Sequence, residues 1–174
     1  MLDQVVFSRR LDETQWQRGG EIGFAGYIEP YPWLVVDPND PDHAYTALKG
    51  DIPGFGTKSL MQETFDGGMT WTNDLHSLYE QFHTSGLLPL LAKVLGGEIS
   101  QPEIDPHDST RMYSGAKGGV MVSKNGGKNW SRGGMGFEIP WVRTVFAPRH
   151  SEWLFAGTPG GLYLSKNDGK QWEP

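Results

Sequence analysis

The sequence contains no cysteine, so disulfide bonds, thiol nucleophiles and cysteine-ligated metals are excluded. No apolar run approaches the roughly 20 residues of a transmembrane helix, and residues 1–7 lack the features of a signal peptide. Basic residues are few and scattered, with 15 Lys and Arg against 21 Asp and Glu and a net charge of −6. Because phosphate backbones are bound by clustered basic side chains, this balance argues against a nucleic-acid partner.

Glycine is abundant instead, and it recurs in one motif. The first copy reads Thr-Phe-Asp-Gly-Gly-Met-Thr-Trp over residues 64–71, and the others occupy residues 123–130 and 165–172. A short Asp or Asn side chain bonds nearby amides, glycine accepts a positive φ, and tryptophan anchors the next strand. These positions therefore predict a structural β-hairpin turn rather than a catalytic or calcium site. They are Asp66, Gly68, Trp71, Asn125, Gly127, Trp130, Asn167, Gly169 and Trp172.

The motif resembles the Asp-box, or BNR, repeat, S-x-D-x-G-x-T-W, which lies at the edge of β-propeller blades. Residues 64–71 match this pattern most fully, whereas Asn125 and Asn167 replace its Asp. A fourth, degenerate copy ends at Trp16. The resemblance is to the sialidase, sortilin and xyloglucanase-like superfamily, and it implies a propeller fold and an extracytoplasmic location.

The repeat extends upstream of the turn. Each unit has a proline-containing turn eight residues before an aromatic residue, at Asp37 and Tyr45, Asp105 and Tyr113, and Ala147 and Phe155. The distance from the aromatic residue to the tryptophan is nine residues longer in the first unit than in the others. This spacing predicts an insertion within residues 49–58.

Each unit is predicted to contain four short strands. In the third unit these cover residues 142–147, 153–157 and 161–165 and begin again at residue 171, with apolar residues on both faces. The expected fold is all-β, a β-propeller segment of three to four four-stranded antiparallel blades with one short helical insertion. The predicted domain is a single partial propeller over residues 1–174. Its blades are 1–20 (partial), 33–74, 103–132 and 141–174, with the insertion at 75–100.

The helical insertion is predicted from apolar residues at positions 75, 78, 79 and 82, a helical spacing. Ring closure is a separate expectation, because a closed propeller has about four to eight blades. Three arrangements provide closure: further blades of a longer propeller, self-association, or a small propeller completed by the N-terminal strands. The first is favoured, since residues 4–8 read as the third strand of a blade.

Two groups of loops emerge on opposite faces of a four-stranded meander. The repeated turns lie on one face, and the loops that differ between units lie on the other, where a rigid scaffold usually carries recognition. Aromatic and charged residues on this second face suit a glycan or a protein partner. The ligand-binding candidates are Lys49, Asp51, Phe55, Lys58, Lys117, Arg132 and Trp141. The leading interpretation is a non-catalytic recognition or assembly scaffold.

The alternative is a fragment of a sialidase-like or xyloglucanase-like glycoside hydrolase. Such enzymes use two carboxylates, and Asp51 and Glu138 are the best pair by topology. Residues 137–140 are similar to the sialidase F-R-I-P signature, but Glu138 stands where that family has arginine. Asp37 and Asp105 are interpreted as turn residues. The five histidines show no metal-ligand spacing, and no cofactor is predicted; they are His43, His76, His83, His107 and His150.

Overall fold

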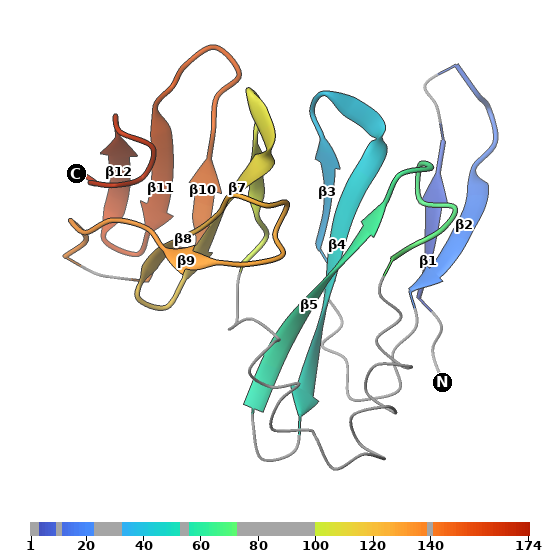
Figure 1. Cartoon of the computed structure of the whole chain (residues 1–174), viewed down its shortest axis with the longest axis horizontal. Helices are drawn as coiled ribbons and strands as arrows, with labels where there is room; N and C mark the ends of the chain where they lie inside the picture. Colours follow the sequence, from blue (N-terminus) through green and yellow to red (C-terminus); the bar gives the residue numbers. More distant parts are fainter. Residues whose placement is uncertain (1–3, 10–11, 23–32, 53–55, 73–99, 139–140) are drawn as a thin grey trace. The chain divides into compact units, whose positions relative to one another are not determined.

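The computed structural model of the chain describes residues 4–9, 12–22, 33–52, 56–72, 100–138 and 141–174 (Figure 1). The described part contains strands β1 to β12 and no helix, and its four sheets are antiparallel. The predicted all-β class is therefore confirmed. Residues 75–99 of the predicted helical insertion lie outside the described residues.

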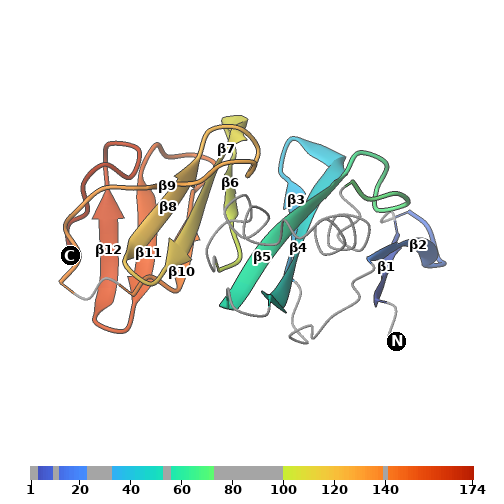
Figure 2. The ribbon, with the colours of Figure 1, turned by 60° about the horizontal axis from the view of Figure 1, so that its bottom comes forward.

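The chain forms two compact units, residues 1–97 and residues 98–174. In the first unit, one hairpin and one three-stranded meander are described (Figure 2). The hairpin consists of β1 (Gln4–Ser8) and β2 (Gln17–Ile22). The meander consists of β3 (Trp33–Asp37), β4 (Asp40–Ile52) and β5 (Gly56–Thr64).

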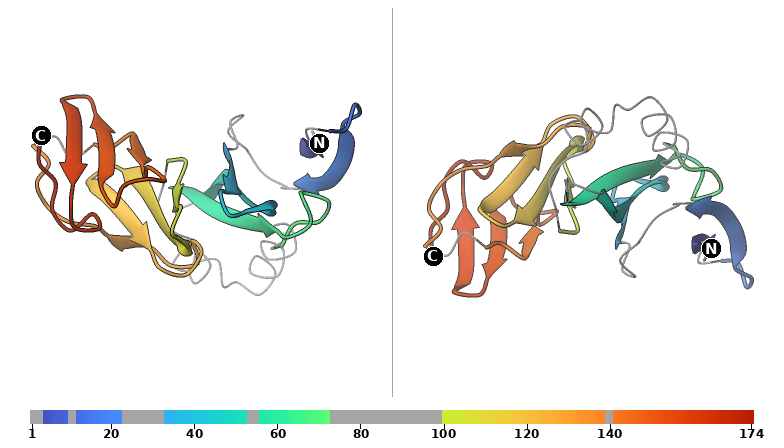
Figure 3. Two further views of the ribbon diagram at one scale, coloured as in Figure 1. Left: turned by 90° about the horizontal axis from the view of Figure 1, so that it is seen from above. Right: turned by 90° about the horizontal axis from the view of Figure 1, so that it is seen from below.

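The second unit contains a four-stranded and a three-stranded meander (Figure 3). The first of these consists of β6 (Glu103–Asp105), β7 (Asp108–Ala116), β8 (Gly119–Ser123) and β9 (Ser131–Arg132). The second consists of β10 (Thr144–Phe146), β11 (Leu154–Thr158) and β12 (Gly161–Ser165). A bridge between Leu164 and Glu173 begins a fourth strand, so the strand order predicted for this segment is confirmed.

The three repeated turns, residues 64–71, 123–130 and 165–172, share one set of hydrogen bonds. In the first turn, the Gly68 amide donates to Thr64 Oγ1 at 3.0 Å and the Thr70 amide donates to Asp66 Oδ1 at 2.8 Å. The same two bonds recur from Gly127 to Ser123, Asn129 to Asn125, Gly169 to Ser165 and Gln171 to Asn167. Three glycines at the same position have positive φ: Gly68 at 90°, Gly127 at 78° and Gly169 at 76°. The turns are therefore closed by short side chains and by glycine.

The insertion in the first unit lengthens a hairpin. Leu48 pairs with Leu60, just as Ala116 pairs with Gly119 in the second unit. Only two residues separate Ala116 from Gly119, but β4 and β5 continue beyond Leu48 until Ile52 pairs with Gly56. The extra residues were expected to form a loop, but the described ones extend the strand ladder, and their role in recognition stays a prediction.

The core of residues 98–174 lies between its two sheets. Tyr113 and Val120 from the β6–β9 sheet belong to the same buried cluster as Ala156 and Tyr163 from the β10–β12 sheet. Trp172 of the third repeated turn joins this cluster and is only 3% exposed. The two sheets therefore pack face to face. The tryptophan of the turn is buried in the core between them, as expected of an anchoring residue.

Candidate functional site

Three of the predicted ligand-binding residues meet on the loop face of residues 98–174. Lys117, in the turn between β7 and β8, forms an antiparallel bridge with Trp141, which precedes β10. The guanidinium of Arg132 lies over the same turn, with Nη2 2.8 Å from the position that a Cβ on Gly118 would occupy. Gly118 has a φ of 109°, so glycine both forms this turn and leaves room for the arginine. The structure therefore brings Lys117, Arg132 and Trp141 together.

Trp141 is the aromatic centre of this group. Its side chain remains 47% exposed, and the Arg143 guanidinium carbon lies 4.9 Å from its ring centroid. A cation over an indole face is attracted by the ring quadrupole, which fixes the ring's orientation. Arg143 was not among the predicted site residues. Its position two residues after a tryptophan, just before β10, is the signal that the sequence offered.

The other predicted site residues do not join this group in the described part of the chain. Lys49 pairs with Ser59, Asp51 with Thr57, and Lys58 with Gly50, all within the long β4–β5 hairpin. Phe55 lies outside the described residues. Glu138 is exposed, and its amide donates to the Tyr163 hydroxyl at 3.3 Å. Because Asp51 and Glu138 belong to different units, their pairing as two catalytic carboxylates stays a prediction.

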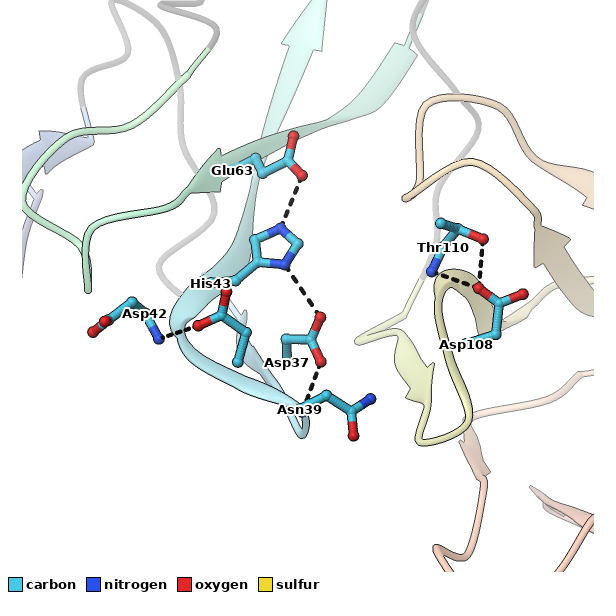
Figure 4. A network of polar contacts seen from close by, with 8 residues as sticks. Asp37, Asn39, Asp42, His43, Glu63, Asp108 and Thr110 are labelled. Atoms are coloured by element: carbon cyan, nitrogen blue, oxygen red, sulfur yellow. Dashed lines mark hydrogen bonds and ion pairs between the residues drawn. The ribbon is translucent and has the colours of Figure 1, made fainter.

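A second polar group, missed by the sequence analysis, lies beside the β3–β4 turn (Figure 4). His43 Nδ1 lies 3.2 Å from Asp37 Oδ2, and His43 Nε2 lies 2.9 Å from Glu63 Oε1. Asp37 is 3% exposed and also accepts the Asn39 amide at 2.8 Å. The Phe65 ring stacks on His43 with centroids 4.6 Å apart. We name this group, Asp37, His43 and Glu63, the histidine cluster.

The positions of Asp37 and His43 recur in the second unit, but their contacts do not. The position of His43, six residues after the turn aspartate, holds Arg111 in the second unit, where the aspartate is Asp105. In the third unit, alanine replaces the aspartate and Trp153 replaces the basic residue, so the acid and the base disappear together. The two units hold these residues differently, since Asp37 Oδ2 lies 3.2 Å from His43 Nδ1, whereas Arg111 pairs with Asp168 at 3.3 Å. Glu63 is the element specific to the first unit.

The tyrosines beside these groups stay protonated at neutral pH. Burial and the neighbouring Glu63 raise the pKa of Tyr45 well above its ordinary value. Burial also raises the pKa of Tyr113 to about 12, although the hydrogen bond with Arg111 opposes the change. Tyr113 donates its hydroxyl hydrogen to Asp105 Oδ2 at 3.2 Å. Both tyrosines therefore act as hydrogen-bond donors and core residues, not as bases.

Two further observations concern the described residues alone. They contain no group of three or more His, Asp or Glu side chains arranged to hold a metal ion. The part of the chain that the structure describes also has no helix of the length and apolar character needed to span a bilayer. His76 and His83 lie outside the described residues.

Comparisons with known proteins identify the fold through solved structures alone. No protein-family model matches the chain, and neither does any curated protein sequence. Among solved structures, the chain is similar to the GH74 xyloglucanase from Xanthomonas campestris, with 18% identity and a TM-score of 0.53 over 81% of this chain and 22% of that one. An ancestral GH74 enzyme shows 15% identity and a TM-score of 0.48 over 90% of this chain and 19% of that one.

The likeness to the xyloglucanase shows the fold and no more. That enzyme is a β-propeller, and the chain described above, with its repeated antiparallel meanders, is a propeller segment. The chain spans about a fifth of the length of the solved structures that it matches.

Proposed function

We propose that this propeller segment binds a glycan on the face opposite its repeated turns, with Trp141 as the stacking surface. The observation that carries the proposal is the half-exposed Trp141, whose ring is oriented by Arg143 at 4.9 Å and whose backbone is bridged to Lys117. Aromatic rings held in this way offer an apolar surface to the C–H groups of a sugar ring.

The surrounding side chains supply hydrogen-bond donors. Arg132 lies over Gly118, one residue from Lys117, so two cationic groups from different elements flank the turn beside Trp141. Guanidinium and ammonium groups donate to sugar hydroxyl and carboxylate oxygens. A protein ligand with exposed acidic groups is the alternative partner for the same surface.

The proposal includes the Asp-box type of the repeated turns. Its support is that a hydroxyl, an Asp or Asn and a glycine make the same hydrogen bonds in three copies. Propellers of this type are often extracytoplasmic, and a polysaccharide partner fits that location. On this interpretation, Asp66, Asn125 and Asn167 shape the scaffold and do not contact ligand.

A second candidate function is that of a glycoside hydrolase segment, favoured by the likeness in fold to a xyloglucanase. Asp51 and Glu138 remain its candidate acid and base. Glycoside hydrolysis requires two carboxylates about 5 to 10 Å apart across the scissile bond. The binding proposal is preferred because the described loop face gathers cationic and aromatic side chains, whereas Glu138 is its one candidate carboxylate.

Affinity electrophoresis against soluble polysaccharides tests the binding proposal. The panel includes neutral xyloglucan and a carboxylated glucan. The variant Trp141→Ala should bind the polymer that the parent chain binds with an affinity at least about tenfold lower. Trp153→Ala is a matched control, because Trp153 is also 47% exposed and has Lys166 5.3 Å from its ring. Trp153 lies on the side of the repeated turns, so this variant should bind like the parent chain.

Reducing-sugar release from the same polymers separates the two candidates. The binding proposal expects none, whereas a hydrolase segment would release sugar that Glu138→Gln abolishes. Equal loss of binding in Trp141→Ala and Trp153→Ala would show that the proposed face is not the site. No binding to any glycan, together with capture of an acidic protein ligand, would replace the glycan by a protein partner.

A further inference from the structure

We propose that Asn125, in the second repeated turn, is a modification site at which the chain converts asparagine to aspartate by itself when the turn opens. Asn125 is followed by Gly126, and this is the one Asn-Gly pair in the sequence. Asparagine is a chemically labile residue, and a following glycine has no side chain to shield its amide nitrogen. That nitrogen can therefore attack the carboxamide of Asn125, and water is the sole co-reactant.

The reaction replaces an amide by a carboxylate in two steps. The Gly126 nitrogen loses its proton and bonds to Asn125 Cγ, while the side-chain nitrogen takes up a proton and leaves as ammonia. Water then opens the five-membered ring. Cleavage between Cγ and the nitrogen gives aspartate on an unchanged backbone. Cleavage at the main-chain carbonyl gives isoaspartate, in which the backbone is one methylene longer.

The folded turn engages both reacting groups in other bonds. The Gly126 amide donates to the Thr110 carbonyl at 2.8 Å, which keeps the proton on the attacking nitrogen. Asn125 Oδ1 accepts the Ser123 hydroxyl at 3.0 Å and the Asn129 amide at 2.9 Å, so its carboxamide is fixed in the turn. Asn125 is exposed, and water reaches it. The reaction therefore waits for these hydrogen bonds to break, which is a local opening of the turn.

The first repeated turn shows that the aspartate product fits. Asp66 and Gly67 stand there in the places of Asn125 and Gly126. Asp66 Oδ1 accepts a hydroxyl and an amide, each at 2.8 Å, as Asn125 Oδ1 does in the second turn. The Gly67 amide donates to the Asp42 carbonyl at 2.9 Å, as the Gly126 amide does to its own partner. The aspartate product can therefore close the turn again with the same bonds, whereas isoaspartate lengthens the backbone between them.

The third repeated turn isolates the contribution of Gly126. Asn167 Oδ1 accepts a hydroxyl at 3.1 Å and an amide at 2.8 Å, so its side chain is held as that of Asn125 is. The next residue is Asp168, with a φ of 57°, where the second turn has Gly126 with a φ of 62°. The two turns therefore share their geometry and differ in the side chain beside the attacking amide. Asn167 should react much more slowly than Asn125.

Peptide mass spectrometry of the whole chain, aged at mildly alkaline pH in buffer and in urea, tests the proposal. Asn125 should convert at least about tenfold more slowly in buffer, because only the opened turn reacts. In urea, Asn167 should remain largely intact while Asn125 converts. Ser123→Ala removes one bond to Asn125 Oδ1 and should raise the rate in buffer. Ser165→Ala is the same change in the third turn and should leave the rate at Asn125 unchanged.

The controls make each part of the proposal open to contradiction. An Asn125 that stays intact in urea would not be a modification site, and one that reacts equally fast in buffer would not be controlled by the turn. Equal acceleration by Ser123→Ala and Ser165→Ala would assign the reaction to global unfolding instead. Asn125→Asp supplies the product directly, and its free energy of unfolding at neutral pH should lie close to that of the parent chain. A large loss of stability in this variant would show that the aspartate product does not fit.

Discussion

At the scale of single residues, the closest approach in residues 98–174 depends on glycine. The segment 133–136 runs beside the third repeated turn, where the Gly134 amide donates to the Gly169 carbonyl at 2.7 Å. The Trp172 amide donates to the Met135 carbonyl at 3.1 Å. A Cβ on Gly134 would lie 1.6 Å from the Lys170 carbonyl oxygen, and one on Gly136 would lie 2.2 Å from the Trp172 carbonyl oxygen. The backbone of this segment therefore approaches the core tryptophan closely only because residues 134 and 136 are glycine.

We expect Gly134→Ala to lower the free energy of unfolding by about 3 to 5 kcal/mol, because backbone must move to admit the methyl group. Urea denaturation followed by tryptophan fluorescence measures the change. Gly161→Ala is the control, since no atom lies within 4 Å of its Cβ position and only its φ of 132° is unfavourable. That variant should lose about 1 kcal/mol. Equal losses in the two variants would contradict the close-approach explanation.

At the scale of elements, the repeated turns differ at the position of Asp66, which is a carboxylate in the first turn and an amide in the other two. Asp66 accepts the Thr70 hydroxyl at 2.6 Å and the Thr70 amide at 2.8 Å, and these bonds lower the pKa of Asp66 to about 2. A carboxyl whose pKa is lower in the folded than in the unfolded chain stabilises the fold when it is ionised. The contribution is therefore complete above the ordinary pKa and is lost as the pH falls through about 2.

Asp66→Asn should remove this pH dependence and leave the turn intact. An amide oxygen still accepts the Thr70 amide, as Asn125 and Asn167 do for the equivalent amides of the other turns. The free energy of unfolding, measured in urea from about pH 6 downward, should fall less steeply with acid in the variant than in the parent chain. Asn125→Asp, the reciprocal change, should steepen it. Parallel pH profiles for all three chains would show that Asp66 is not the group responsible.

Some elements of the structure could be predicted from the sequence, and others could not. The repeated turns and the strands of the third unit could be predicted, because each depends on short-range spacing and on residues with strong local preferences. The insertion near Lys49 could be located by counting, but its form could not. Whether added residues make a loop or extend two strands depends on cross-strand pairing, here Leu48 with Leu60, which local preferences do not determine.

The candidate site, too, could be predicted from the sequence only in part. Topology placed Lys117, Arg132 and Trp141 on one face. Lys117 bridges Trp141 and Arg132 lies over Gly118, and the role of the three in ligand binding stays a prediction. The partner of Trp141 and the histidine cluster were missed, since both join side chains whose contact depends on rotamers and on neighbouring strands. The His43 and Glu63 contact, for example, joins residues 20 positions apart on β4 and β5.

At the scale of the whole molecule, charge is distributed unevenly between two units that each have their own fold. Residues 1–97 hold 13 acidic and 6 basic residues, and residues 98–174 hold 8 and 9, so the net charge of −6 is the sum of −7 and +1. Repulsion between copies therefore depends on the acidic unit, and attraction depends on exposed apolar side chains such as Leu162. The balance between these forces is set by pH, since protonation of carboxylates removes the repulsion and leaves the apolar faces unchanged.

Solubility should consequently be lowest near the sequence pI of about 5.3, where the net charge is zero, and should rise toward pH 8. Static light scattering at the two pH values measures this directly. The variant Leu162→Lys adds charge and replaces an apolar side chain that is 62% exposed, so its scattering should rise less on acidification. If scattering by the parent chain were the same at both pH values, carboxylate repulsion would not control association. If this variant scattered like the parent chain near pH 5.3, surfaces other than the one around Leu162 would be responsible.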